Sequence, residues 1–326
     1  MNNIFRRKLF AVILCSLFLA ISVSAQQGPA TWNGYPPDYV APVGSGPYPA
    51  VMEADPSLPT HTIYHPTALD KFGGKLKLPI VAFANGACGN VGSMYRNFLT
   101  EIASQGFLII AIGPIGADMS AMPRPTPPPG GPPAARASGA PRQLPPVATQ
   151  STQLIDAVNW ALAQNGQAGS KYRGKLDPNE IVLMGQSCGG IQAIEMSADP
   201  RVKTTVVLNS GLFSGPSPIP GLDVPESQLD KLHAPVAYFI GGSKDVAYQP
   251  SEHNFPLIKV PVFKADIDVG HMATYAQPNG GIFGEMVGDW LKWQLKGDKN
   301  AAAQFTGTDC GLCKDPKWTV ERKGIL

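Results

Sequence analysis

The chain is built around the stretch Ile181-Val182-Leu183-Met184-Gly185-Gln186-Ser187-Cys188-Gly189-Gly190. Its four leading apolar residues predict a short buried strand, and the Gly-Gln-Ser-Cys-Gly that follows predicts a sharp turn into a helix. Gly185 and Gly189 would let strand and helix pack closely, with Ser187 strained at the tip of the turn. This context is typical of a nucleophile elbow, Gly-x-Ser-x-Gly, although a Gly- and Ser-rich segment after a strand can also be an ordinary turn.

Apolar runs of strand length lie on both sides of this stretch. Such runs, without polar alternation, are typical of strands buried on both faces, and here they alternate with segments of helical periodicity. Strand–helix–strand order with buried strands predicts a parallel sheet with right-handed crossovers. We therefore expect an α/β fold in which a mostly parallel central sheet carries helices on both faces. The expected strands are 61–65, 78–84, 107–112, 181–184, 203–208, 235–240 and 260–267, and the expected helices include 92–104, 149–165 and a closing amphipathic helix at 282–295.

Composition indicates one ordinary globular domain. Of 326 residues, 44% are hydrophobic and 15% charged, and the net charge of +2 argues against a nucleic-acid-binding face, which needs concentrated basic residues. Many of the 33 prolines and 35 glycines gather in residues 114–148, where no core can be built. We interpret this segment as an insertion in a single domain, 26–326, although its Pro-x-x-Pro spacing also fits proline-reading partners.

The first 25 residues have the pattern of a secretory signal. Arg6, Arg7 and Lys8 precede an apolar run at 9–23, and Val23-Ser24-Ala25 is a small-x-small cleavage site. The run is short for a membrane-spanning helix, so an uncleaved anchor is the weaker alternative. We expect a secreted or periplasmic protein without a stable membrane anchor.

Two polar residues later in the chain occupy the places expected for partners of a serine nucleophile. Serine hydrolysis needs a base that takes the hydroxyl proton and a carboxylate that orients the base. On a sheet with a nucleophile elbow these partners follow in the order serine, acid, histidine. Asp245 follows the strand expected at 235–240, and His271 follows the one at 260–267. The predicted catalytic residues are Ser187, Asp245 and His271.

Other acids and histidines compete for these roles. Asp266 and Asp268 are close to His271 in sequence, but they lie at the end of the last strand rather than after the previous one. An aspartate in a Gly-rich turn, as Asp245 is, can also be only a turn residue. His253 in a polar loop is the main competitor of His271, because the remaining histidines precede either the nucleophile or a strand: His61, His65 and His233.

An oxyanion hole requires two backbone donors. One is expected from the residue after the nucleophile, Cys188, and the other from the loop after an earlier strand, where Ala87 is the natural candidate. Because both donors are main-chain groups, truncating the Ala87 side chain would not remove them.

Four cysteines follow the signal: Cys88, Cys188, Cys310 and Cys313. Four cysteines allow three pairings in an oxidising compartment. Since Cys88 adjoins one expected donor and Cys188 supplies the other, our hypothesis is a disulfide between them, and the alternative is two free buried thiols. Cys310 and Cys313 would then close on each other or fasten the tail. A zinc site would need two further ligands, and none is evident, so no metal is expected.

In these features the chain resembles the α/β-hydrolase superfamily, and within it secreted esterases of the dienelactone-hydrolase, chlorophyllase and cutinase-like polyester-hydrolase branch. Gly46-Pro47-Tyr48, Ile63-Tyr64-His65-Pro66 and Ala103-Ser104-Gln105-Gly106-Phe107 look like landmarks of bacterial polyester hydrolases, in the same order. The resemblance implies the triad Ser187, Asp245 and His271. The chain departs from the branch at Cys188, where polyester hydrolases commonly have methionine.

We therefore expect a serine esterase that cleaves small or polymeric esters through an acyl-enzyme, without a cofactor and as a monomer. The alternatives are a serine peptidase and a non-catalytic binding protein on the same fold. Residues 210–226 are expected to form the second wall of the substrate pocket, with Tyr275 and Phe283 as further candidates, although core packing is the simpler role for Phe283.

Overall fold

The computed structural model describes residues 43–116 and 146–325. The predicted signal sequence, 1–25, and most of the predicted insertion, 114–148, lie outside the described residues. Within the described residues, no helix combines the length and apolar character needed to cross a membrane.

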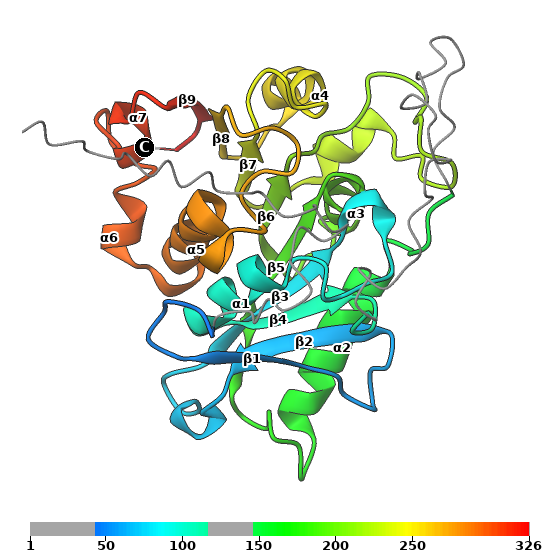
Figure 1. Cartoon of the computed structure of the whole chain (residues 1–326), viewed down its shortest axis with the longest axis vertical. Helices are drawn as coiled ribbons and strands as arrows, with labels where there is room; N and C mark the ends of the chain where they lie inside the picture. Colours follow the sequence, from blue (N-terminus) through cyan, green and yellow to red (C-terminus); the bar gives the residue numbers. More distant parts are fainter. Residues whose placement is uncertain (1–42, 117–145, 326) are drawn as a thin grey trace, which may run out of the picture.

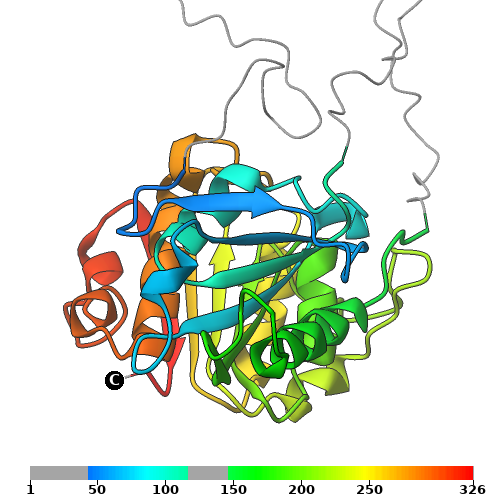
Figure 2. The ribbon, with the colours of Figure 1, turned by 90° about the horizontal axis from the view of Figure 1, so that it is seen from below.

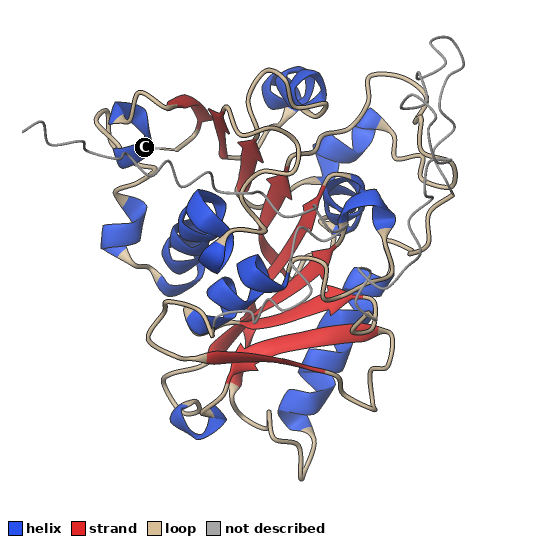
Figure 3. Ribbon diagram, viewed as in Figure 1, coloured by secondary structure: helices blue, strands red, loops and turns tan. Residues whose placement is uncertain are grey.

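A twisted sheet forms the centre of the described chain (Figures 1 and 3). Its nine strands follow the order β1-β2-β4-β3-β5-β6-β7-β8-β9 in the part of the chain that is described. From β4 across to β8 all neighbours are parallel, and β1, β2 and β9 are antiparallel additions at the edges. The strands are β1 (Ala50–Glu53), β2 (His61–Pro66), β3 (Leu78–Ala84), β4 (Leu108–Ile112), β5 (Leu176–Gln186), β6 (Val202–Leu208), β7 (Val236–Ile240), β8 (Val262–Ile267) and β9 (Trp318–Lys323).

Helices cover both faces of this sheet, as predicted (Figure 2). Helices α1 and α5 pack on one face, and α2 and α3 pack on the other. The helices are α1 (Arg96–Ser104), α2 (Gln153–Gly166), α3 (Cys188–Met196), α4 (Tyr248–Asn254), α5 (Gly281–Lys296), α6 (Lys299–Ala302) and α7 (Gly311–Lys314), with 3-10 turns η1 (Leu69–Lys71), η2 (Gly86–Cys88), η4 (Glu226–Lys231), η5 (Phe255–Leu257) and η6 (Pro278–Gly280).

Strand β3 shows why a continuous apolar run predicted a strand buried on both faces. All seven of its residues are buried. Because side chains alternate along a strand, Val81 and Phe83 pack with α1 and α5, whereas Ile80 and Ala82 pack with α2. A polar residue at any of these positions would be removed from water on either face.

Some predicted boundaries were wrong. The helix expected at 92–104 begins only at Arg96, because the Gly92 N–H bonds to the carbonyl of Pro114 and the chain turns before it can coil. The helix at 282–295 does not close the fold, since β9 follows it and pairs with β8. Strand β1 was also missed, and it starts inside a stretch that contains Gly and Pro.

The order of the strands creates a crevice. The chain passes from β3 to β4 on one side and then crosses to β5 on the other side of β3. In open parallel sheets, ligands bind outside the carboxyl ends of the strands at such a reversal. The loops after β3 and β5, which carry Ala87 and Ser187, meet at this point.

Candidate active site

The turn between β5 and α3 has the geometry that its sequence predicted. Ser187 has φ 53° and ψ −121°, a positive-φ conformation that a residue with a side chain rarely adopts. A side chain at Gly185 would collide with the carbonyl of Gly189, and one at Gly189 would collide with the carbonyl of Ala84. Only glycine permits this approach of helix to strand, so the predicted roles of both glycines are confirmed.

Ser187, His271 and Asp245 form one hydrogen-bonded chain. His271 Nε2 lies 2.9 Å from Ser187 Oγ, and His271 Nδ1 lies 2.6 Å from Asp245 Oδ1. The three residues come from the loops after β5, β7 and β8, whose carboxyl ends share one edge of the sheet. The Asp245 side chain is fully buried, whereas 29% of the His271 side chain is exposed. The arrangement links a buried acid to a solvent-accessible hydroxyl through an imidazole.

The Asp245 carboxylate accepts hydrogen bonds from three further donors. Oδ1 accepts the N–H of Ala247 at 2.9 Å, and Oδ2 accepts the N–H of Gly241 at 2.9 Å and the Asn209 amide at 2.7 Å. Burial acts to raise the pKa of Asp245, but the hydrogen bonds from His271 and these donors outweigh it and lower the pKa. The carboxylate is therefore ionised and oriented toward His271.

None of the competing acids and histidines reaches Ser187. Asp266 lies 3.3 Å from the Lys264 ammonium, and exposed Asp268 is 3.9 Å from that of Lys244. His253 pairs with Glu226 at the surface. The other histidines bind main-chain carbonyls: His61 that of Gln153, His65 that of Pro66, and His233 that of Val202.

A cavity of about 570 Å³ opens beside Ser187. Both predicted oxyanion residues, Ala87 and Cys188, line it together with His271. The predicted second wall is also present, since five residues of 210–226 reach the cavity, but Tyr275 and Phe283 do not line it and are buried in the core. The lining as a whole is mostly apolar and includes Met94, Tyr95, Ile191, Phe213, Pro218, Ile219, Val246, Ala247, Pro250 and Met272.

The cysteines pair as predicted. Cys88 and Cys188 form a disulfide with Cα atoms 5.2 Å apart, across 100 residues of sequence. Cys310 and Cys313 form a second, local disulfide with Cα atoms 4.9 Å apart. The first joins the loop after β3 to the beginning of α3, so it connects the neighbour of one predicted donor, Ala87, to the other predicted donor, Cys188.

The sequence did not identify the polar residues behind the site. The Asn209 amide donates to Asp245, and its carbonyl accepts the Tyr275 hydroxyl. Gln186 donates to the main-chain carbonyl of His271 at 3.1 Å and accepts the Tyr95 hydroxyl at 2.7 Å. Asn209 follows a predicted strand, but its partners lie more than thirty residues away, so no local pattern marked it.

One group of carboxylates has metal-like spacing. Ligand oxygens of Glu252, Asp266 and Glu321 all lie within 4.8 Å of one another. The ammonium group of Lys264 pairs with all three carboxylates and already supplies the positive charge. The side chain of Lys264 is fully buried, so we interpret the group as an internal ion cluster.

The chain matches no protein-family model, and a search of curated proteins finds no match.

Proposed function

We propose that the protein is a serine esterase with an α/β-hydrolase fold. The observation that carries the proposal is the hydrogen-bonded chain from Asp245 through His271 to Ser187, which ends at a cavity. The strained backbone at Ser187 and the order of serine, acid and histidine along the chain support the same reading. A turn with only a structural role would require neither a base at 2.9 Å nor a buried acid behind it.

In the proposed reaction Ser187 Oγ attacks the ester carbonyl while its proton passes to His271 Nε2. The tetrahedral intermediate collapses when His271 returns that proton to the leaving alcohol, and the acyl group stays on Ser187. Water, deprotonated by His271, then attacks the acyl carbonyl, and the acid leaves as Ser187 regains its proton. Asp245 keeps the imidazole in the orientation and tautomer that make Nε2 the base.

Developing negative charge on the carbonyl oxygen needs fixed donors. The backbone N–H groups of Ala87 and Cys188 are the proposed pair, since both residues line the cavity beside Ser187. Removing one such donor from a serine hydrolase typically slows the reaction by about 10²–10³-fold. The positive end of α3, which begins at Cys188, favours the same charge.

The cavity supports neutral, apolar ester groups as substrate. No Asp, Glu, Lys or Arg is among its described lining residues. A charged substituent would lose its hydration there without an opposite charge to replace it. Val246 and Met272, exposed at 75% and 60%, extend this apolar character to the mouth of the cavity.

The test is hydrolysis of 4-nitrophenyl esters by the wild type and Ser187→Ala. We expect a Ser187-dependent rate on butyrate or hexanoate esters, at least about 10⁴-fold above the variant, and little rate on the charged monosuccinate ester. A fluorophosphonate probe should label Ser187. Equal rates in both proteins would refute the catalytic proposal, and cleavage of peptide anilides in place of esters would change the substrate class.

We also propose export of the protein. Two disulfides are typical of oxidising compartments, and the amino-terminal 25 residues have the pattern of a signal. Amino-terminal sequencing of the mature protein should begin at Gln26. A mature protein that begins at Met1 or Asn2 in the cytoplasm would refute export.

A further inference from the structure

The loop that carries Ala87 has an unfavourable backbone. Ala87 and Cys88 are consecutive residues with positive φ, 55° and 45°, and Ser187 across the crevice has φ 53°. Left-handed conformations cost energy in residues that have side chains, so they persist only where the surroundings hold them. What holds this loop also determines where the N–H of Ala87 points.

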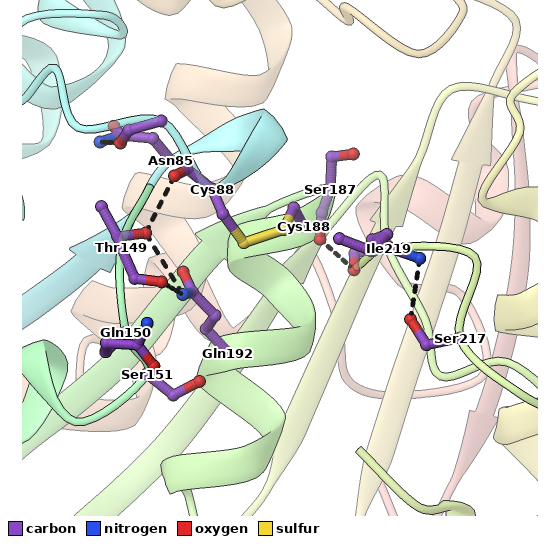
Figure 4. Close-up of a disulfide and its surroundings, with 12 residues drawn as sticks. Asn85, Cys88, Thr149, Gln150, Ser151, Ser187, Cys188, Gln192, Ser217 and Ile219 are labelled. Atoms are coloured by element: carbon purple, nitrogen blue, oxygen red, sulfur yellow. Dashed lines mark hydrogen bonds between the residues drawn. A yellow bond between two sulfur atoms is a disulfide. The ribbon is translucent and has the colours of Figure 1, made fainter. Parts of the chain in front are cut away.

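Two side-chain links fasten this loop from the side of α3 (Figure 4). The first is the disulfide from Cys88 to Cys188, which is the first residue of α3. The second is the Thr149 hydroxyl, which donates to the main-chain carbonyl of Cys88 at 3.0 Å. Both links act on Cys88, one through its sulfur and one through its backbone.

Thr149 is itself held by the same helix. Gln192, one turn along α3 from Cys188, donates from Nε2 to the Thr149 carbonyl at 3.1 Å and to its hydroxyl oxygen at 3.3 Å. All four residues are at most 4% exposed. Cys88, Cys188, Thr149 and Gln192 therefore close a buried ring of contacts between the loop and α3, which we call the loop brace.

The opposite side of the loop is also in contact. A side chain at Gly86 would collide with the Gln186 amide oxygen and the Tyr95 hydroxyl, which are hydrogen-bonded to each other. The loop thus lies between this pair and the loop brace. Release of the brace would let the loop move away from α3 and Ser187, because the disulfide and the Thr149 hydrogen bond resist their separation.

We propose that Thr149 and the Cys88–Cys188 disulfide are positioning residues that hold the N–H groups of Ala87 and Cys188 at the distance required by the oxyanion. The inference rests on the proposed esterase function. Donors placed for a developing charge act mainly in the transition state, so their displacement lowers kcat more than it changes KM.

The first experiment removes the disulfide without removing a donor. The double variant Cys88→Ala/Cys188→Ala keeps both backbone N–H groups, and Cys310→Ala/Cys313→Ala is a matched control that lacks the disulfide distant from the cavity. On 4-nitrophenyl butyrate, at a temperature where both variants are folded, we expect kcat about 10- to 100-fold below wild type in the first and within about 2-fold in the control. KM should stay within about 3-fold in both.

A second set of variants tests Thr149 without altering a cysteine. Thr149→Val keeps the shape and removes the hydroxyl, whereas Thr149→Ser keeps it. We expect kcat about 10-fold lower in the valine variant, a parallel loss of affinity for a boronic acid transition-state analogue, and recovery of both in the serine variant.

The outcomes separate the two proposals. A wild-type rate that depends on Ser187, together with wild-type kcat in both Thr149→Val and the Cys88/Cys188 double variant, would overturn the positioning role and leave the esterase in place. A lower melting temperature with unchanged kcat would likewise mean that the brace is only structural. Absence of any Ser187-dependent rate would overturn both proposals.

Discussion

Two buried aspartates, one in the loop after β7 and one in the neighbouring strand β8, have opposite surroundings. Asp245 follows β7 and accepts hydrogen bonds from an imidazole, an amide and two main-chain N–H groups. Asp266 lies in β8, where Oδ2 is 3.3 Å from the Lys264 ammonium and Oδ1 has no hydrogen-bond partner within the described chain. Both residues are nearly inaccessible, at 4% and 6% exposure. Burial alone therefore does not distinguish a candidate catalytic acid.

The pKa values move in opposite directions. Burial raises the pKa of both carboxyls, but at Asp245 the hydrogen bonds outweigh it and lower the pKa. At Asp266 burial, with the negative charges of Glu252 and Glu321, outweighs the attraction of Lys264 and raises the pKa. Hydrogen-bond donors and neighbouring charges thus determine in which direction burial is overcome or reinforced in the pKa of each acid.

The largest expected difference between the two sites is catalytic. Asp245→Asn should lower kcat for 4-nitrophenyl butyrate by about 10⁴-fold, because an amide no longer holds the imidazole in the required tautomer. Asp266→Asn, a matched change in a carboxylate that does not contact His271, should leave kcat within about 2-fold. A large loss in Asp266→Asn with a small one in Asp245→Asn would reverse the assignment of the acid.

The second difference concerns stability and depends on Lys264. Its side chain is fully buried among Glu252, Asp266 and Glu321, so Lys264→Met would leave clustered carboxylates without a cation. Breaking a buried ion pair destabilises a protein by about 3–5 kcal/mol. Because Glu252 and Glu321 are partly exposed, we expect Lys264→Met to lower the free energy of unfolding by about 3 kcal/mol.

Urea unfolding measures this loss, and Lys314→Met is the control. Lys314 pairs with Asp309 at 3.6 Å, and both side chains are well exposed, so its loss should change the free energy of unfolding by less than about 1 kcal/mol. Equal effects of the two substitutions would show that the ion cluster is not a buried one.

A smaller effect is expected for Asn209, whose amide is one of the four donors to Asp245. Asn209→Ala removes one hydrogen bond to a charged oxygen, worth about 1.5–3 kcal/mol, and leaves three donors in place. We expect kcat about 10-fold below wild type with KM little changed. Since Tyr275 loses its acceptor in the same variant, Tyr275→Phe is the control and should keep most of the rate.

The contrast also shows what the sequence could predict. The loops of Ser187, Asp245 and His271 were predictable because each follows a predicted strand, and parallel strands bring their carboxyl ends to one edge. The close approach of strand and helix at Gly185 was predictable because this glycine is part of a recognisable sequence motif, Gly-x-Ser-x-Gly.

The partners of these residues were not predictable. Asn209 acts on Asp245 through the packing of one loop against another, and an asparagine after a strand otherwise indicates an ordinary turn. Lys264 shares a strand face with Val262 and Asp266, and its burial depends on Glu252 from α4 and on β9, which the sequence did not indicate. Contacts between distant segments leave no local periodicity in the sequence, so no sequence pattern predicts them.

The smallest predicted effect is a difference in the pH dependence of stability. The pKa of an aspartate in the unfolded chain is about 3.9. Because the folded pKa of Asp245 is lowered, its contribution to stability is complete above that pH and is lost as the pH falls through the folded value. The folded pKa of Asp266 is raised, so the unfolded chain releases this proton first, and stability falls as the pH rises from about 3.9 to the folded value.

Urea unfolding of the wild type, Asp245→Asn and Asp266→Asn between pH 3 and pH 7 measures both contributions. The stability advantage of wild type over Asp245→Asn should grow with pH, since the ionised carboxylate is the form that its donors stabilise. The corresponding difference between wild type and Asp266→Asn should decrease with pH, because a neutral amide avoids the cost of a buried charge. Two difference curves that change with pH in the same direction would mean that the two aspartates share one electrostatic environment, which the contacts of Asn209, Gly241 and Lys264 argue against.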